Sequence, residues 1–594
     1  MPVRQPSFFD ITNSISGKRW RARLVDDRGA LAISQRLNLP EVLGRVLSAR
    51  GVAVEDAEAF LNPKIRDLLP DPLHLLDMDK AIARIVNAIE GGERIGVFAD
   101  YDVDGACSAS ILTRFLSEIG REVTVYVPDR VIEGYGPNSA ALMKLKDEGV
   151  TLVLTVDCGT TAFEPLRTAA ENGLDVIVID HHVAEPQLPA AVAIVNPNRF
   201  DETSPVAQLC AAGVVFLLVV ALNRELRDRF WYEEGHNEPD LMAWVDLVAL
   251  ATVADVVKLT GVNRALVKNG LSVMAKRENH GIAALANIVD LDQKPEAWHL
   301  GFLLGPRVNA GGRVGEPGLG VRLLTTTDPD EAATLAVQLD KYNSERREIE
   351  AAVLASAMAQ AERQAVTDSP LIVVAAEGWH PGVIGIVAAR IKDTFNRPTC
   401  VISLEKGLGK GSGRSVRGVE LGPAIIAAQQ ADYLINGGGH AMAAGFTLLE
   451  ERIEEFKEFL TEHISGQLGG RVLVPELGVD GALSVEGANL DLIEILDKAG
   501  PYGAGNPRPR FVLTSVKVLS PKSVGVDHVS CFLGAPESSR RIRAISFRSL
   551  GKPIGEALMN GRGTSLHVAG HLNVNDWQGE KKPQFVIEDV ARLL

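Results

Sequence analysis

The sequence predicts an α/β protein, with two α/β domains joined by a long helix and followed by an all-β domain at the C-terminus. From residue 95 to about 200, short apolar runs rich in β-branched residues alternate with helical stretches, and a second such unit follows residue 370. The last 90 or so residues contain several short strand-like runs. Because 594 residues are too many for one hydrophobic core, several domains are expected.

The first α/β unit contains the apolar runs IGVFAD, VTVYVP, TLVLTVD, DVIVID and AVAIVN. Apolar strands that alternate with helices predict a parallel sheet covered by helices on both faces. Ligands of such sheets bind beyond the carboxyl ends of the strands. We therefore expect the chemistry of this unit at that edge.

Acidic or imidazole side chains follow three of these strands: Asp100, Asp102 and Asp104 after the first, Asp157 after the third, and Asp180, His181 and His182 after the fourth. A single Asp at a strand end is usually a helix N-cap. Carboxylates from three strands at one edge favour a cation site instead, because crowded like charges need a positive counterpart. Carboxylates with one imidazole suit Mn²⁺ or Mg²⁺, and two-metal sites usually share a bridging aspartate.

Residues 328–366 predict one long helix between the two α/β units. Asp328 occupies an N-cap position and Pro329 the first helical position, and the helix formers that follow include no Gly and no further Pro. The second unit carries two glycine-rich segments, GKGSGRSVRG and NGGGHAMAAGF. One such segment is usually a tight turn, but two that also carry Arg and His favour a binding site.

The C-terminal runs RFVLTSVKVLS, HVSCFLG, RIRAISFR, SLHVAGHLNV and PQFVIEDV predict a β-barrel of the OB type. From residue 503 onward the chain has 13 Lys and Arg against 7 Asp and Glu, although its overall net charge is −15. This excess of basic residues is about equally well explained by chance and by nucleic-acid binding. The aromatic side chains of this region are either stacking surfaces for single-stranded bases or core: Phe511, Phe532, Phe547 and Trp577.

The motifs DYDVDG, VDCGT and DHH, followed by GSGRS and GGGHAMAAG, resemble the DHH phosphoesterase superfamily and its DHH-associated domain. The segments ATVADVV, VNAGGR, WHPGVIGIVAARI and PYGAGNPRPRF bring the resemblance closer to its single-strand-specific 5′-to-3′ DNA exonucleases. It covers the chain from about residue 40 to the end. It implies hydrolysis of single-stranded DNA to 5′-mononucleotides with two Mn²⁺ or Mg²⁺ ions, in DNA repair and recombination.

The resemblance also implies roles for individual residues. The metal ligands, which are also the catalytic residues, would be Asp102, Asp104, Asp157, His181 and Asp255. Asp157 would be the bridge, Asp100 is a further candidate ligand, and His182 would be catalytic near the scissile phosphate. Related pyrophosphatases carry a histidine where this chain has Phe98, so one ion is expected to be held more weakly. Asp180 would either orient the histidines or act as a simple cap.

A terminal phosphate needs a receptacle, and the resemblance implies the substrate-binding residues Arg130, Arg313, Ser412, Arg414, Ser415 and His440. Backbone N–H groups of GSGRS beside the guanidinium of Arg414 are expected to form a concave anion site. Because the metal cluster is indifferent to direction, this site would set the polarity of attack.

The expected domains are an N-terminal helical segment (1–90), a DHH domain (91–327), a connecting helix (328–366), a DHH-associated domain (367–470) and an OB-type nucleic-acid-binding domain (471–594).

Two other functions remain open. A DHH phosphodiesterase for short oligoribonucleotides or cyclic dinucleotides usually lacks the long helix and basic barrel. A catalytically inactive DNA-binding relative is disfavoured, because every ligand position is filled.

Single-stranded DNA is the expected partner, while a helicase and a single-strand-binding protein are candidate partners that the sequence does not identify. No membrane partner is expected, because the longest apolar run, residues 211–222, is too short to span a bilayer. The five cysteines are scattered without a C-x-x-C pair, and the N-terminus lacks the apolar region of a signal peptide. These features indicate a reducing cytoplasm.

Overall fold

The computed structural model describes residues 7–130, 132–535, 539–577 and 580–593. The chain divides into two compact units. The α/β unit comprises Leu69–Val257 and Leu266–Leu473, and the barrel unit comprises Met1–Leu68, Lys258–Ala265 and Val474–Leu594. A short segment, Lys258–Ala265, thus belongs to the barrel unit although the sequence on both sides of it belongs to the α/β unit.

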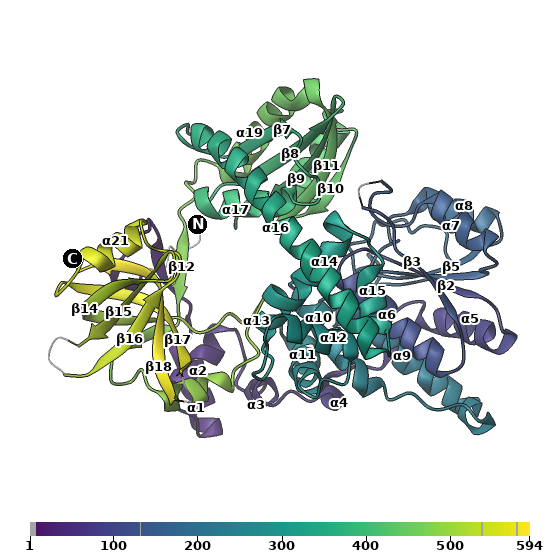
Figure 1. The fold of residues 1–594 in the computed structure, drawn as a ribbon, viewed down its shortest axis with the longest axis horizontal. Helices are drawn as coiled ribbons and strands as arrows, with labels where there is room; N and C mark the ends of the chain where they lie inside the picture. Colours follow the sequence, from purple (N-terminus) through teal and green to yellow (C-terminus); the bar gives the residue numbers. More distant parts are fainter. Residues whose placement is uncertain (1–6, 131, 536–538, 578–579, 594) are drawn as a thin grey trace. The chain divides into compact units, whose positions relative to one another are not determined.

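The α/β unit begins with the predicted parallel sheet, in the order β3 (Val123–Tyr126), β2 (Ile95–Ala99), β4 (Leu152–Val156), β5 (Asp175–Ile179) and β6 (Ala193–Val195). Helices α7 (Ser139–Asp147) and α8 (Phe163–Glu171) cover one face (Figure 1). Helices α5 (Met78–Gly91), α6 (Val103–Glu118) and α9 (Ala211–Asp228) cover the other. Every residue of β2 and β4 is buried, as continuous apolar strands between two helical layers should be.

A helical layer continues the same unit, and its elements are α10 (Val245–Ala254), α11 (Gly261–Met274), α12 (His280–Ile288), α13 (Ala297–His299), η5 (Leu300–Leu304), α14 (Gly305–Val314) and α15 (Leu319–Thr325). The first residues of α11, up to Ala265, belong to the barrel unit. The predicted long helix follows as α16 (Pro329–Ala365), and the Asp328 side chain caps it by accepting from the Asp330 N–H at 2.9 Å. Its first part packs against α12 and α14, and its second part packs against the next sheet.

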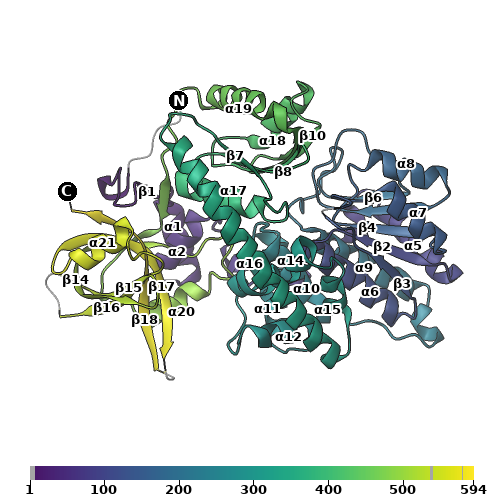
Figure 2. The same ribbon diagram turned by 45° about the horizontal axis from the view of Figure 1, so that its top comes forward.

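The second α/β domain is a mixed sheet in the order β10 (Asn436–His440), β11 (Ala443–Leu449), β9 (Leu408–Arg414), β8 (Thr399–Glu405) and β7 (Ile372–Glu377). Only the β7–β8 pair is parallel among its described pairings. Helix α16 and α17 (Ile384–Phe395) cover one face. Helices α18 (Leu421–Gln430) and α19 (Ile453–Leu468) cover the other (Figure 2).

The barrel unit contains the predicted β-barrel: β14 (Phe511–Val524), β15 (His528–Gly534), β16 (Arg541–Ser546), β18 (Glu580–Arg592) and β17 (Ser565–Trp577), closed by β17 pairing back onto β14. Strand β13 (Gly481–Leu483) joins β14 in parallel, and β1 (Arg19–Ala22) pairs with β12 (Glu476–Val479). The helices of this unit are α1 (Asp27–Leu37), α2 (Glu41–Ala49), α3 (Ala57–Leu61), α20 (Leu490–Asp497) and α21 (Pro553–Asn560).

The N-terminal helices and the barrel share one hydrophobic core. Ile33 and Leu43, from α1 and α2, are fully buried in the same cluster as Phe511, Val568 and Phe585 of the barrel. Residues up to 68 therefore fold with the C-terminal part of the chain, whereas α5 packs on the parallel sheet of the α/β unit.

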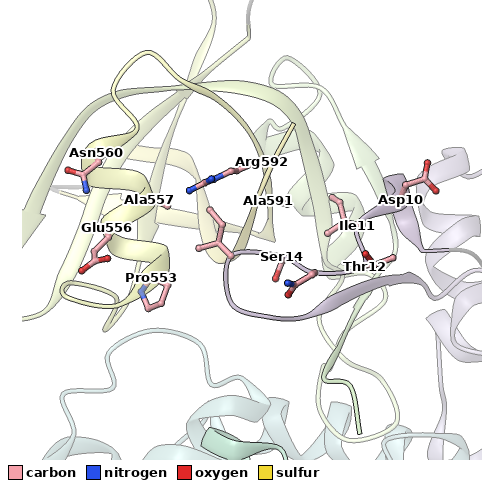
Figure 3. A pocket seen from close by; sticks show the side chains of 12 residues that line it. Asp10, Ile11, Thr12, Ser14, Pro553, Glu556, Ala557, Asn560, Ala591 and Arg592 are labelled. Atoms are coloured by element: carbon pink, nitrogen blue, oxygen red, sulfur yellow. The ribbon is translucent and has the colours of Figure 1, made fainter. Parts of the chain in front are cut away.

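The barrel unit also has a surface cavity of about 560 Å³ (Figure 3). Its walls come from residues 10–15, from α21 and from the end of β18, and they include none of the predicted site residues. The longest apolar run, residues 211–222, lies in α9 and is almost entirely buried. Within the described residues, no helix is long and apolar enough to cross a membrane.

Candidate metal centre and phosphate site

The loop after β2 leads straight into α6, and its carboxylates are held by backbone donors. Asp102 is the N-cap of α6 and accepts from the N–H groups of Asp104 (2.8 Å) and Gly105 (3.2 Å). Asp104 is buried and accepts from the N–H groups of Ala211 (2.7 Å) and Ala212 (2.8 Å), at the start of α9. Both hydrogen bonds to Asp102 go to Oδ1, which leaves Oδ2 for a cation, and each oxygen of Asp104 keeps a second lone pair, so these contacts do not exclude cation binding.

Asp100 and Asp157 are buried carboxylates with an unsatisfied oxygen. They are 4% and 2% exposed, and Oδ1 of each accepts no hydrogen bond from any described residue. Burial, reinforced by the neighbouring aspartates, raises the pKa of both well above the usual value. Asp157 has a φ of 60°, in the left-handed region that Asp and Asn tolerate better than most residues.

Asp180 organises the histidine loop after β5. Its carboxylate accepts from the N–H groups of Thr160, His181 and His182 and contacts Nδ1 of His182 at 2.7 Å. Although burial alone would raise the pKa of Asp180, the hydrogen bond and charge of His182 lower it below its usual value. Burial likewise lowers the pKa of His182, but Asp180 outweighs it and raises that pKa to about 9. The structure therefore favours an orienting role for Asp180 over a simple cap.

His181 and Asp255 complete the cluster. Nε2 of His181 lies 3.3 Å from Asp157 Oδ1, 3.7 Å from Asp104 Oδ2 and 3.8 Å from Asp255 Oδ2. Burial, followed by the charge of Asp104, raises the pKa of Asp255 to about 8. Three overlapping groups have ligand atoms within 4.8 Å of one another: Asp104, His181 and Asp255; Asp100, Asp102 and Asp157; and Asp157, His181 and His182.

This donor set fits divalent cations that prefer oxygen ligands. Two buried carboxylate oxygens lack a donor among the described residues, and burial together with neighbouring aspartates raises the pKa of Asp100 and Asp157, which a bound cation would offset. The donors are carboxylates and imidazoles, without a thiolate, which suits Mn²⁺ or Mg²⁺. Asp157 belongs to two of the three groups, as a bridging ligand would.

Beside this cluster, three guanidinium groups approach one another: Arg130, Arg313 and Arg414. Burial and then the charge of Arg130 lower the pKa of Arg414, and the same causes lower that of Arg313 to about 10. Arg313 donates to the carbonyl of Gly382 at 3.0 Å. None of the three forms a salt bridge with a carboxylate in the described part of the chain, so together they offer an anion site.

The GSGRS segment is not the loop that the sequence predicted. Its first residues lie in β9, between β8 and β11, so their N–H groups serve the sheet and the expected backbone receptacle is wrong. The glycines serve packing instead, since a Cβ at Gly411 would lie 2.1 Å from the ring of Phe446. On the opposite face, Ser412 and Arg414 lie against α17, since a Cβ at Gly385 would lie 2.8 Å from the Arg414 guanidinium and 3.0 Å from Ser412 Oγ.

Two further predicted residues have different surroundings. The exposed His440 ring lies 6.3 Å from the His182 ring, so the structure brings it to the metal cluster. Ser415 is only 1% exposed, and its hydroxyl donates to the carbonyl of Val419 at 2.7 Å. The Ser415 side chain is therefore buried in the domain, where its hydroxyl is used by this hydrogen bond, and it does not contribute to the arginine site.

Two residues near the site, Tyr135 and His380, were not predicted from the sequence. The Tyr135 hydroxyl donates to the carbonyl of Asp157 at 3.0 Å and lies 3.2 Å from Nδ1 of His182. Nδ1 of His380 accepts from the Gly382 N–H at 3.0 Å, and burial followed by the charge of Arg130 lowers the His380 pKa. Tyr135 lies in PDRVIEGYG and His380 in WHPGVIG, and no spacing in either segment marks them as site residues.

Comparison with known families defines the class of this protein. The sequence matches the DHH family, N-terminal domain, over residues 94–252 and the DHHA1 domain over residues 368–466. These matches coincide with the two sheets that carry the metal cluster and Arg414. The fold and the site therefore define a DHH phosphoesterase with a divalent-metal centre.

The remaining matches are more specific. Residues 479–589 match the RecJ OB domain. The chain is 33% identical to the single-stranded-DNA-specific exonuclease RecJ of Bacillus subtilis, over 97% of this chain and 71% of that one. It is 34% identical to RecJ of Escherichia coli, over 96% and 98%. The crystal structure of RecJ from Thermus thermophilus with Mn²⁺ matches with a TM-score of 0.80 at 30% identity, over 97% and 80%.

The chain belongs to the RecJ family of single-stranded-DNA-specific exonucleases. A second Thermus thermophilus RecJ structure, which contains Mg²⁺, matches with a TM-score of 0.74. The predicted enzyme class and overall fold are thereby confirmed, and neither the oligoribonucleotide phosphodiesterase nor the inactive relative is favoured.

Proposed function

We propose that this protein degrades single-stranded DNA from the 5′ end to 5′-mononucleotides, using two Mn²⁺ or Mg²⁺ ions. One observation carries the proposal: within one unit, a carboxylate–histidine cluster lies beside three arginines without carboxylate partners among the described residues. The cluster suits the chemistry of cleavage, and the arginines suit recognition of a strand end.

The residues divide between two ion positions. Asp104, His181 and Asp255 would hold one ion and Asp100 and Asp102 the other, with Asp157 shared. Divalent ions in such a site activate a water molecule and stabilise the charge that develops on the phosphoryl oxygens. Asp180 holds the imidazole of His182 beside the cluster.

Polarity would come from the second α/β domain. Two ions can cleave any phosphodiester that reaches them, so an end-specific enzyme needs a site that senses what lies beyond the scissile bond. Arg130, Arg313 and Arg414 with Ser412 offer charge-assisted donors for a 5′-phosphate. His440 would link the phosphate site to the metal cluster, because its ring approaches the ring of His182.

The barrel would bind the strand further along. Arg541 and Arg543 are exposed on β16, the guanidinium of Arg541 lies 4.9 Å from the Phe532 ring centroid, and Phe547 is 53% exposed. Basic and aromatic side chains on one surface suit single-stranded DNA. Phe511 is core at 1% exposed, and the Trp577 side chain lies outside what the structure describes. Arg543→Ala should weaken strand binding and lower its salt dependence, with Arg562→Ala as a control.

We place this activity in DNA repair and recombination, where a helicase would supply single strands and a single-strand-binding protein would cover them. The cytoplasm is the proposed location, since all five cysteines are free and buried: Cys107, Cys158, Cys210, Cys400 and Cys531.

The test uses single-stranded DNA and RNA labelled at either end, incubated with Mn²⁺, Mg²⁺ or EDTA. We expect a 5′ label on DNA to appear as mononucleotide in the first turnovers, a 3′ label to shorten gradually, and EDTA to stop both. Asp157→Asn protein, purified in parallel, controls for contaminating nucleases. Early release of the 3′ label, or activity that survives EDTA, would contradict the proposal.

A further inference from the structure

Two aromatic side chains of the α/β unit are exposed on the helical segment that leads into α14. Trp298, in α13, is 44% exposed, and Phe302, in η5, is 73% exposed. Because they are four positions apart on one continuous helix, they project from the same face. Phe302 also lies in a short π-helical turn, a feature that occurs frequently at functional sites. We call Trp298 and Phe302 the aromatic pair.

This helical segment packs against the end of α10 that carries Asp255. A Cβ at Gly301 would lie 3.4 Å from Cγ1 of Val253, and a Cβ at Gly305 would lie 3.4 Å from Cβ of Ala254. Val253 and Ala254 immediately precede Asp255, which is a member of the metal cluster. The segment, α10 and the cluster all belong to the α/β unit, so the aromatic pair lies beside the metal centre within one unit.

Trp298 is held in place by a buried histidine. The ring centroids of Trp298 and His299 lie 3.9 Å apart, and His299 is 0% exposed. Nδ1 of His299 accepts from the Glu296 N–H at 2.8 Å, and Nε2 lies 3.1 Å from the side-chain amide of Gln293. Trp298 therefore presents a fixed surface, and a surface that is ordered before binding loses little entropy when a ligand stacks on it.

Positive charge accompanies the aromatic pair. Arg307 donates to the Leu303 carbonyl at 2.7 Å and forms an ion pair with Asp340 of α16 at 2.8 Å, which ties the segment to the long helix. Burial lowers the pKa of Arg307, Asp340 opposes this shift, and the charge of Arg347 adds to it. Arg347 thus lies nearby, and it is exposed without a salt bridge among the described residues. Aromatic rings and exposed guanidinium groups are the two components of single-strand binding sites.

The aromatic pair and the arginine site border different ligand groups of the cluster. The Arg130 guanidinium lies 5.1 Å from the Tyr101 ring centroid, and a Cβ at Gly312, next to Arg313, would lie 2.5 Å from the Tyr101 carbonyl. Tyr101 separates the two aspartates that follow β2 in one group, whereas Asp255 belongs to another. Helix α14 begins directly after the aromatic pair and carries Arg313 near its other end, so its 10 residues separate the two sites by about 15 Å.

We propose that Trp298 and Phe302 form a platform on which bases of single-stranded DNA stack, on the 3′ side of the scissile phosphate. A strand with its 5′-phosphate in the arginine site passes the metal cluster and then reaches the platform. Every base has a π face, so the platform holds the strand without sequence preference. The position beside a metal ligand favours the substrate over a protein partner as the occupant. The inference rests on the proposed function, in which the 5′ end lies at the arginines.

The experiment measures release of the first nucleotide from 5′-phosphorylated single strands in Mn²⁺. One abasic nucleotide is placed at each position in turn from the 5′ end. In the unmodified protein, kcat/KM should fall roughly five- to tenfold when the missing base is one that stacks on the platform. Phe302→Ala should lower kcat/KM on the intact strand by a similar factor, through KM, and should lower it no further on that abasic strand.

Phe230→Ala is the matched control, because Phe230 is also exposed, at 63%, but follows the far end of α9. Helix α9 begins at Ala211, whose N–H binds Asp104, and its 18 residues span about 27 Å. Phe230→Ala should cleave every strand like the unmodified protein. Phe302→Tyr keeps a stacking ring and should retain the unmodified kcat/KM. Trp298→Ala should reproduce the position-specific loss, and thermal melting shows whether that protein is folded.

The outcomes separate the platform from the proposed function. If Phe302→Ala and folded Trp298→Ala both cleave intact strands with the unmodified KM, the platform is refuted while 5′-to-3′ cleavage stands. Abasic penalties that persist unchanged in Phe302→Ala would show that the bases stack elsewhere, which also refutes the platform. If the unmodified protein does not release the 5′ nucleotide first, the proposed function fails and the platform fails with it.

Discussion

The two α/β domains place their functional side chains in different ways. In the parallel sheet, most of the acids and both histidines lie just beyond β2, β4 and β5, in the loops or, for Asp104, in the first turn of α6. In the mixed sheet, Ser412 and Arg414 lie within a central strand and act from its face. The first arrangement brings together residues that are far apart in sequence, whereas the second needs only alternate residues of one strand.

This difference shows why acids at strand ends predict a binding site better than glycines within a strand do. Parallel strands end at one edge, where loops leave backbone and side chains available for a ligand. A central strand between two antiparallel neighbours has already used its N–H groups. Glycines in such a strand therefore cannot form a backbone cradle, and at Gly411 and Gly413 they make room for Phe446 and Leu421.

The largest expected effect comes from the sheet edge. Asp157→Asn keeps the shape of the side chain and tolerates the left-handed backbone, but it removes the charge of a carboxylate that belongs to two of the three ligand groups. Losing several kcal/mol of transition-state stabilisation lowers cleavage about 10³-fold or more. Asp147→Asn, on the exposed end of α7, is the control. Appreciable nuclease activity in a folded Asp157→Asn protein would refute the two-metal assignment.

The same variant should be more stable than the metal-free wild type, and increasingly so as pH rises. The pKa of Asp157 is raised in the folded state, so folding disfavours its charged form and the wild type loses stability above the ordinary carboxyl pKa. Asparagine has no such proton to lose. Melting temperatures in EDTA between pH 5 and pH 8 measure the difference, which should widen with pH.

The next effect tests the strand face. Arg414→Ala removes a charge-assisted contact of about 1.5–3 kcal/mol, so cleavage of 5′-phosphorylated single strands should fall roughly tenfold or more. The loss should be smaller on 5′-hydroxyl strands, which never made the full contact. Arg417→Ala, at an exposed position nearby, should leave both substrates unaffected. An equal Arg414→Ala defect on both substrates would show that this arginine does not recognise the phosphate.

The sequence predicted the parallel sheet and its acidic edge because both follow from local patterns. Apolar strands with Asp at their ends, such as Asp104 and Asp157, are visible in the sequence, and topology brings such ends together. Asp255 was identified by resemblance alone, since an aspartate at the end of a helix has no sequence pattern that predicts metal binding. Tyr135 and His380 were missed because their roles depend on tertiary contacts with Asp157 and Gly382.

The GSGRS segment was misjudged as a backbone receptacle for a different physical reason. A glycine that frees the backbone and a glycine that makes room for a neighbour have the same sequence signature. Gly411 is of the second kind, since Phe446 occupies the space of its Cβ, but Phe446 follows 35 positions later in the sequence. Such packing is settled only when β9 and β11 pair.

Substitution of these glycines tests that conclusion. Gly411→Ala should lower the free energy of unfolding of the α/β unit by about 1–3 kcal/mol, because an added methyl overlaps the Phe446 ring in a filled core. Gly445→Ala is the matched control, since it lies in the adjacent strand β11 with open space around its Cβ position. Denaturant titration measures both, and equal losses would show that packing does not explain the glycine.

The smallest effect compares two serines of the same motif, Ser412 and Ser415. Ser412 Oγ accepts from the Arg414 guanidinium at 3.2 Å, so Ser412→Ala should reduce cleavage of 5′-phosphorylated strands two- to threefold, by about 0.5 kcal/mol, without changing the melting temperature. Ser415 is buried and donates to the Val419 carbonyl, so Ser415→Ala should lower stability by about 1 kcal/mol and leave the preference for a 5′-phosphate unchanged. Cleavage rates on phosphorylated and hydroxyl strands, measured beside thermal melts, separate the two effects. A loss of phosphate preference in Ser415→Ala would mean that the buried serine shapes the anion site after all.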